Sequence, residues 1–188
     1  MKKNTISTRK LVVAAMLAAL TAVGSALRFT FPIDFGGTSS FHLGNIMCAL
    51  SGILLGPWMG GLAAGLGSAI YDMFNPLYIS ECWLTFLLKG AYGLASGLVI
   101  CCGKKNWGYA RALIAAVAGA MAYAVLYLAK SFFYSGLLLQ GLSVDAAWVT
   151  VISKLPATIF NAVIAIIAAP LLAITIRTAL KRSHLHLE

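Results

Sequence analysis

The sequence is poor in charged residues, and acidic residues are the scarcest. Only 10% of its 188 residues are charged, and five acidic residues stand against fourteen Lys and Arg. Hydrophobic residues make up 61% of the chain, and the mean hydropathy is +0.90. A soluble domain of this size needs more polar side chains to cover its surface. The composition therefore excludes an ordinary soluble domain and predicts an integral membrane protein.

Nucleotide-binding and metal-binding motifs are also missing. The sequence has no GxxxxGK[ST] loop, so any energy from nucleotide hydrolysis must come from partner proteins. The four cysteines, at positions 48, 82, 101 and 102, show no paired CxxC spacing and are typical of small buried residues. The closing HLHLE, residues 184–188, is interpreted as a frayed tail or an expression remnant. We expect no metal and no cofactor.

Long apolar stretches predict an all-α bundle of six transmembrane helices in a single domain, residues 1–188. Residues 11–27 and 112–129 contain no charged side chain, and roughly 20 apolar residues cross a bilayer as a helix. The first stretch also resembles a signal peptide, but its length and the early Arg28 favour a retained helix. The helices are expected at about residues 9–28, 40–56, 57–74, 81–102, 110–134 and 147–177.

Positive charges predict the orientation of the bundle. They gather before the first predicted helix, between the fourth and fifth, and after the sixth: Lys2, Lys3, Arg9, Lys10, Lys104, Lys105, Arg111, Arg177, Lys181 and Arg182. Six crossings would put all of them on one side, which the positive-inside rule makes cytoplasmic. We therefore expect both termini inside and a multi-pass protein of the bacterial cytoplasmic membrane. The net positive charge favours contact with anionic lipids over a nucleic-acid partner.

Polar residues form a stripe on each of the last three predicted helices. A charge near the bilayer centre costs roughly 2.5 to 3.5 kcal/mol, so these stripes must face protein or water. The alternatives are that the lysines snorkel to the interface, or that Glu81–Lys89 or Asp72–Lys154 pairs serve architecture alone. We favour a polar, aromatic-walled cavity open to the outside. The residues at spacings of three and four are Glu81, Thr85, Lys89 and Tyr92; Tyr123, Tyr127, Lys130 and Tyr134; and Thr150, Lys154, Thr158 and Asn161.

Small residues recur at a spacing of four on the first three predicted helices. Glycines at positions 52, 56 and 60 and at 61 and 65 would let helix backbones approach closely, which favours packing within the bundle. On the first helix the alanine pairs 14/18 and 15/19 fit either packing or a docking face for another membrane protein.

The segments "FHLGNIMCALSGILLGPWMGGLAAGLGSAIYDMF" and "LTFLLKGAYGLASGL" resemble the S components of energy-coupling factor (ECF) vitamin transporters. The resemblance is closest to the riboflavin, hydroxymethylpyrimidine and pyridoxine branch. It implies a subunit without its own ATPase that captures a water-soluble vitamin outside and docks onto a coupling subunit carrying two ATPases. It further implies a pocket between the last three helices, capped by the loops at residues 29–41 and 75–80. The docking residues would be Ala14, Ala15, Ala18 and Ala19.

The predicted substrate-binding residues combine ten of the twelve stripe residues with two residues near the end of the third helix. Three lysines among them favour an anionic or carbonyl-rich ligand, although no motif selects one vitamin. The set is Asp72, Asn75, Glu81, Thr85, Lys89, Tyr92, Tyr127, Lys130, Tyr134, Lys154, Thr158 and Asn161.

Two other functions are considered. An intramembrane enzyme could take acid and base groups from Asp72, Glu81 and His42, but no nucleophile elbow or paired-histidine metal site accompanies them. A stand-alone carrier is expected to show inverted repeats, and the two halves of the chain show no convincing similarity.

Overall fold

The computed structural model describes residues 7–33, 37–102 and 107–183. The terminal HLHLE and the basic residues at positions 2, 3, 104 and 105 lie outside the described residues. Among those described, the structure confirms an all-α bundle with six α-helices. These are α1 (Thr8–Ala26), α2 (Gly44–Leu55), α3 (Pro57–Met73), α4 (Cys82–Cys101), α5 (Tyr109–Lys130) and α6 (Val144–Arg182).

A β-hairpin fills most of the segment that the sequence predicted as a loop. Strands β1 (Arg28–Ile33) and β2 (Gly37–His42) pair antiparallel, with Arg28 opposite His42. Both strands contain aromatic and β-branched residues, which favour strand pairing. Because β2 runs to His42, α2 begins at Gly44 and not near residue 40 as predicted.

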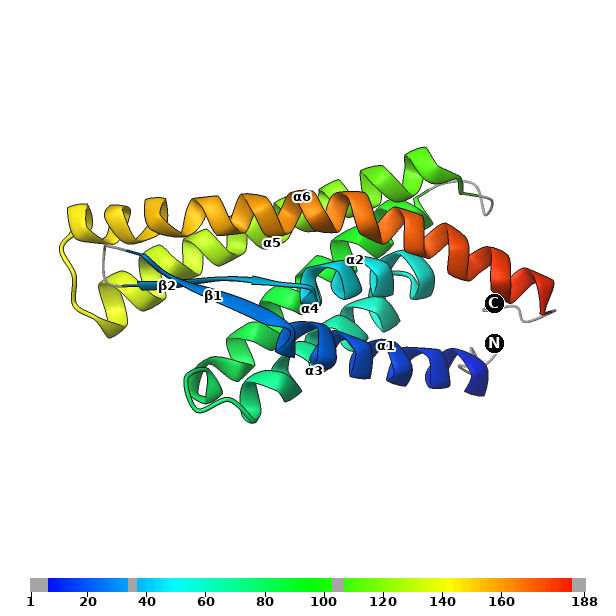
Figure 1. Cartoon of the computed structure of the whole chain (residues 1–188), viewed down its shortest axis with the longest axis horizontal. Coiled ribbons are helices and arrows are strands. Elements are labelled where there is room, and N and C mark those ends of the chain that lie inside the picture. Colours follow the sequence, from blue (N-terminus) through cyan, green and yellow to red (C-terminus); the bar gives the residue numbers. More distant parts are fainter. Residues whose placement is uncertain (1–6, 34–36, 103–106, 184–188) are drawn as a thin grey trace, which may run out of the picture.

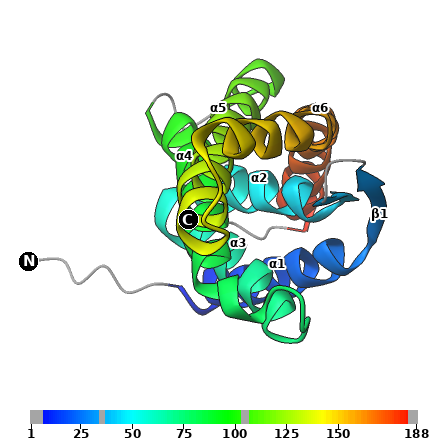
Figure 2. The ribbon, with the colours of Figure 1, turned by 90° about the vertical axis from the view of Figure 1, so that its left-hand side faces the viewer.

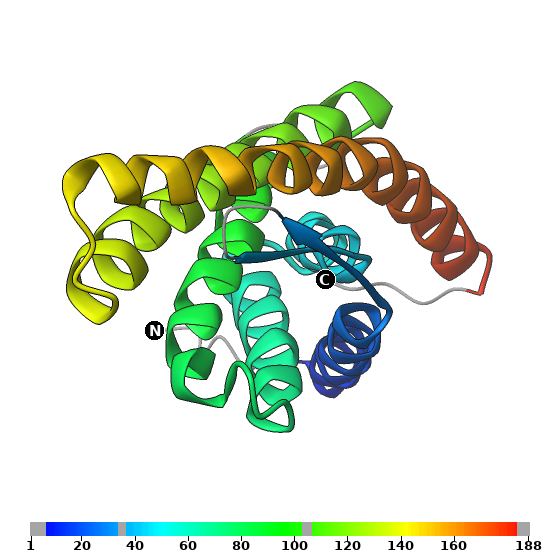
Figure 3. The ribbon, with the colours of Figure 1, turned by 60° about the vertical axis from the view of Figure 1, so that its left-hand side comes forward.

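Two further departures concern the last helices. After α5 the chain continues as η2 (Ser131–Leu139), a π-helix, so the helical segment extends past the predicted end at residue 134. Helix α6 has 39 residues and contains Pro156 and Pro170. It is about 58 Å long at 1.5 Å per residue, and it changes direction along its length (Figure 3).

Four helical segments are long and apolar enough to cross a membrane, namely Thr8–Ala26, Ile79–Cys101, Tyr109–Leu139 and Val144–Arg182. The first of them is α1, and the second joins α4 to the short 3-10 helix η1 (Ile79–Glu81). Helices α2 and α3 are shorter, with 12 and 17 residues, so the number of crossings stays a prediction. The start of α1 and the end of α6 lie at the same end of the molecule (Figure 1), as expected for termini on one side.

The short helix α2 lies in the middle of the bundle. Figure 2 shows α1, α3, α4, α5 and α6 around it, and α2 contacts all five. Ten of its twelve residues are buried. The hairpin passes across the beginning of α2, between α6 and α1 (Figure 3). Helix α2 is thus the central element against which the other five helices pack.

Glycines bring α2, α3 and α4 into backbone contact, as their spacing predicted. A Cβ atom at Gly52 would lie 2.3 Å from the carbonyl oxygen of Gly93. One at Gly67 would lie 2.1 Å from the carbonyl oxygen of Ala18 on α1. These positions tolerate no side chain, so the glycines serve packing within the bundle.

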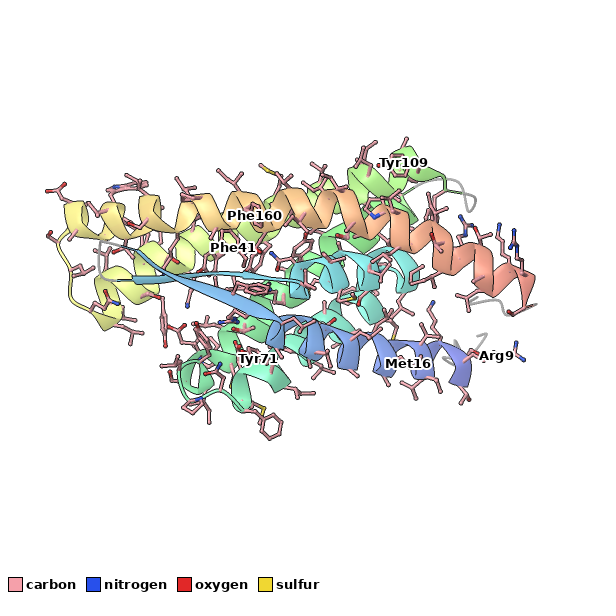
Figure 4. All side chains as sticks on the ribbon, viewed as in Figure 1. Arg9, Met16, Phe41, Tyr71, Tyr109 and Phe160 are labelled. Carbon is pink, nitrogen blue, oxygen red and sulfur yellow. The ribbon has the colours of Figure 1, made fainter. Side chains whose placement is uncertain are left out.

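The alanines of α1 divide between two faces. Ala14 is buried, and Ala18 packs against the core. Ala15 and Ala19 are exposed, on the same helix as Met16, which points away from the bundle (Figure 4). The pair Ala14 and Ala18 therefore lies on the side of α1 that faces the bundle, and the pair Ala15 and Ala19 lies on the outer side. Whether these alanines dock a partner stays a prediction.

Candidate binding cavity

A cavity of about 610 Å³ lies between the hairpin and the helices. Its wall includes residues from the end of α1, the hairpin, α2 and α3 as well as from α4, α5 and α6. The lining residues with charged, amide or imidazole side chains are Arg28, His42, Asn45, Asp72, Glu81, Lys89, Lys130, Gln140, Lys154 and Asn161. Many polar groups thus gather in a cavity inside an otherwise apolar bundle.

Nine of the twelve predicted site residues line this cavity: Asp72, Glu81, Thr85, Lys89, Tyr127, Lys130, Lys154, Thr158 and Asn161. The periodicity of the stripes therefore identified one common interior for α4, α5 and α6. Whether these residues bind a substrate stays a prediction.

Three predicted residues lie outside the lining. Tyr92 is fully buried and stacks on Tyr123 with ring centroids 5.7 Å apart. Tyr134 packs edge-on against Trp83, because the π-helical turn η2 shifts the phase of the stripe after Lys130. The amide Nδ2 of Asn75 donates a hydrogen bond to the hydroxyl of Tyr71 at 3.1 Å.

The sequence analysis missed lining residues that come from the first half of the chain. Arg28 is the first residue of β1, His42 is the last residue of β2, and Asn45 lies in the first turn of α2. Each is an isolated polar residue beside a long apolar run, and that is the signal that would have found it. Ser25 and Ser68 also line the cavity.

The deep lysines are held by neutral groups. Lys89 is 5% exposed, donates a hydrogen bond to Oδ1 of Asn45, and lies 4.1 Å from the ring centroid of Tyr123. Lys154 donates to Oγ of Ser131 at 3.3 Å and lies 5.7 Å from the ring centroid of Tyr127. Both lysines line the cavity, so snorkelling to the interface does not describe them.

The ion pair in the cavity differs from the two considered from sequence. Within the described residues Glu81 pairs with Lys130, and neither Glu81–Lys89 nor Asp72–Lys154 forms. The reason is that the start of α4 and the end of α5 lie at the same end of the bundle. Glu81, just before α4, therefore meets Lys130, the last residue of α5. Arg28, Lys89, Lys130 and Lys154 are four cations against the two carboxylates of Asp72 and Glu81, and the lining is net positive.

The hairpin is fastened to α6 by a side-chain amide. Nδ2 of Asn161 donates to the carbonyl oxygen of Ser40 at 2.9 Å, and the backbone N–H of His42 donates to Oδ1 of Asn161 at 3.1 Å. Beside this amide, the rings of Phe41 and Phe160 meet edge-on with centroids 4.3 Å apart (Figure 4). Strand β2 therefore closes one side of the cavity.

The described residues contain no group of three or more His, Cys, Asp or Glu placed to hold a metal ion. What the cavity offers is ring faces, ammonium donors and amide groups. These features suit a small polar solute that contains a ring.

The fold and the cavity define a multi-pass membrane protein that encloses a cavity lined with polar groups. The family model for "ECF-type riboflavin transporter, S component" matches residues 5–178, so the chain belongs to that family. A protein of Pyrococcus woesei, "Uncharacterized protein in gap 3'region", is 30% identical over 118 residues, 63% of this chain and 74% of the relative. No solved structure matches.

Membership of this family confirms three predictions. The chain is a transport subunit of the ECF type, it is a cell-membrane protein, and it is not an enzyme. The enzyme considered from Asp72, Glu81 and His42 is therefore set aside.

Proposed function

We propose that the chain captures riboflavin, or a closely related flavin, in the cavity and presents it to an ECF coupling module. The observation that carries this proposal is a 610 Å³ cavity lined by tyrosine and lysine side chains. Small-molecule sites typically have volumes of about 300 to 1,000 Å³. A single pyrimidine or pyridine ring would leave much of the cavity unfilled, whereas a three-ring flavin with its ribityl chain would occupy more of it.

The rings of the cavity support a flat ligand. Tyr127 stacks on Tyr123 with centroids 5.5 Å apart and an interplanar angle of 19°, and Tyr123 stacks on Tyr92 behind it. This column presents Tyr127 at the cavity wall, where a further aromatic ring would extend the stack. The ammonium groups of Lys89 and Lys154 would donate hydrogen bonds to the carbonyl oxygens of the flavin.

Entry and release would depend on the hairpin. Because two hydrogen bonds of Asn161 and the Phe41–Phe160 contact hold β2 against α6, opening the cavity on that side requires breaking all three. The closed hairpin would then retain the vitamin until the subunit meets its partners.

Energy for import would come from partner proteins, because the sequence has no nucleotide-binding loop of its own. The expected partners are a transmembrane coupling subunit and two ATPases. The exposed face of α1 with Ala15 and Ala19 is the proposed docking surface, since small side chains permit close helix contact.

Ligand titration tests the proposed function. The purified chain is titrated with riboflavin, hydroxymethylpyrimidine and pyridoxine, with tyrosine and tryptophan fluorescence as the signal, and its absorbance is recorded before any ligand is added. We expect tight binding of riboflavin, weaker binding of the single-ring vitamins, and flavin absorbance if ligand is retained during purification.

Matched tyrosine variants locate the site. Tyr127→Ala removes a lining ring, whereas Tyr109→Ala removes an exposed ring at the start of α5. Loss of stacking should weaken riboflavin binding roughly 3- to 10-fold in Tyr127→Ala only. An absence of affinity for all three vitamins would refute the proposal.

A further inference from the structure

Two polar atoms at the base of the hairpin are buried and have no hydrogen-bond partner among the described residues. They are Nε of Arg28 and Nδ1 of His42. Both residues line the cavity, and they face each other as a cross-strand pair in the hairpin register. Unpaired buried donors and acceptors are costly, and each requires a physical explanation.

Neutral aromatic rings hold the guanidinium of Arg28. Its Cζ atom lies 5.2 Å from the ring centroid of Tyr71 and 4.6 Å from that of Tyr78. These cation–π contacts fix the position of the group but leave its charge uncompensated. Arg28 forms no ion pair with a carboxylate of the described residues.

Lys89 adds a second cation to the same region. Its ammonium is bound by the neutral amide of Asn45 and lies over the ring of Tyr123. His42 belongs to the hairpin and not to a spanning helix, and burial, followed by the positive charges of Lys89 and Arg28, lowers the pKa of its imidazole. Both cations therefore act on the imidazole from nearby.

Asp72 is the second carboxylate of the cavity lining, beside Glu81, which pairs with Lys130. It is 5% exposed, lines the cavity, and forms no ion pair with a described residue. Two cations against one carboxylate leave a net positive charge. Asp72 and Lys89 are each 5% exposed, so solvent screens the interactions between these charges only weakly. An additional anion would complete the charge balance and supply acceptors for the unpaired nitrogens.

We propose that Arg28, His42 and Lys89 form an anion subsite that receives a phosphate monoester carried by the ring-containing ligand. The guanidinium, the imidazole N–H and the ammonium all donate hydrogen bonds, and a phosphate offers several acceptor oxygens. The inference rests on the proposed function, because it assumes that the cavity is the ligand site. It goes further in that the phosphorylated vitamin, flavin mononucleotide in the case of riboflavin, becomes the preferred ligand.

Ligand pairs that differ only by a phosphate test the subsite. The purified full chain is titrated with riboflavin and flavin mononucleotide, pyridoxine and pyridoxine phosphate, and hydroxymethylpyrimidine and its monophosphate. We expect the phosphorylated member of each pair that binds to have a dissociation constant at least about 10-fold lower, as is typical for hydrogen bonds to charged groups.

Variants of Arg28 test the assignment. Arg28→Gln should bring the preference for flavin mononucleotide over riboflavin close to one, with riboflavin affinity changed less than about 3-fold, and Arg28→Lys should keep part of the preference. Lys181→Gln removes one positive charge from the exposed last turn of α6 and is the matched control, with the preference unchanged. If Arg28→Gln does not fold, His42→Gln takes its place and should also reduce the preference, while Arg28→Lys should still keep part of it.

The outcomes separate this inference from the proposed function. Equal or weaker binding of the phosphorylated member in every pair overturns the subsite, even if riboflavin binds tightly. A preference that survives unchanged in Arg28→Gln also overturns it. Preference for a phosphorylated single-ring vitamin without binding of either flavin supports the subsite and refutes the flavin assignment. Failure of all six ligands to bind overturns both.

Discussion

At the scale of single residues, the cavity combines cations with neutral partners. Lys89 and Lys154 are bound to an amide and a hydroxyl, and each lies over a tyrosine ring. An ion pair inside a membrane would neutralise such charges and favour structure alone. Of the four described cations that line the cavity, Lys130 alone lies at ion-pair distance from a carboxylate. The other three, Arg28, Lys89 and Lys154, keep their attraction for a ligand.

Lys154 gives the prediction at this scale. Lys154→Met keeps an unbranched side chain that is one atom shorter and removes the charge, the hydrogen bond to Ser131 and the cation–π contact with Tyr127. We expect riboflavin affinity to fall roughly 10- to 100-fold, the equivalent of about 1.5 to 3 kcal/mol for a charged hydrogen bond. Thermal stability in detergent should not fall, because a partly buried cation without a carboxylate partner at ion-pair distance among the described residues is replaced by an apolar side chain.

Fluorescence titration and a melting curve on the same preparation check this result. Lys181→Met, at the exposed end of α6, is the control for the loss of one charge. Unchanged riboflavin affinity in Lys154→Met would show that Lys154 does not contact the ligand.

At the scale of helices and strands, close glycine contacts set the distance between α2 and α4. Gly52→Ala would place a Cβ 2.3 Å from the carbonyl oxygen of Gly93, whereas Gly90→Ala would place one 3.6 Å from its nearest neighbour. We expect Gly52→Ala to lower stability by about 1 to 3 kcal/mol through overpacking. Gly90→Ala should lie within about 1 kcal/mol of the original protein, because alanine is the better helix former.

Melting temperatures of the two variants in one detergent provide the measurement. Equal melting temperatures would mean that the α2–α4 contact adjusts freely and that the glycines do not set its distance.

The hairpin gives a kinetic prediction. Asn161→Ala removes both hydrogen bonds to β2, and Phe160→Ala removes the ring contact without changing a cavity-lining residue. If the hairpin closes the cavity, both variants should release riboflavin faster, by roughly 5- to 100-fold for the loss of two hydrogen bonds.

Stopped-flow fluorescence measures the release rates. Ile159→Ala, an exposed neighbour on α6, is the control and should release riboflavin at the original rate. A dissociation rate unaffected by Phe160→Ala would place the exit route elsewhere.

The sequence predicted the polar stripes but not the hairpin or the exact cavity lining. The stripes on α4, α5 and α6 were found because helical periodicity and the cost of membrane burial both act locally. The hairpin was missed because its position depends on Asn161, more than 100 residues further along the chain. Tyr134 was assigned to the lining because regular α-helical spacing does not anticipate the π-helical turn. Arg28 and His42 meet only through strand pairing, so no local pattern joins them.

At the scale of the whole molecule, α1 connects the binding cavity to the outer surface. Its end contributes Ser25 to the cavity, and Arg28 follows it at the start of β1. Its buried side packs against α2 and α3. A partner that moves α1 would therefore also move the base of the hairpin. This arrangement offers a physical route by which docking on the outer face of α1 could affect the ligand.

Bulky substitutions on the outer face of α1 test that docking surface. Ala15→Trp and Ala19→Trp, made together, would prevent close approach of a partner helix at two exposed positions one turn apart. We expect the doubly substituted chain to bind riboflavin with unchanged affinity and to lose copurification with the coupling subunit and its ATPases. Ala179→Trp, at an exposed position of α6, is the matched control and should retain the complex. Because ligand binding and assembly are measured on the same variants, copurification that persists in the Ala15→Trp/Ala19→Trp chain would move the docking surface away from α1 without affecting the assignment of the cavity.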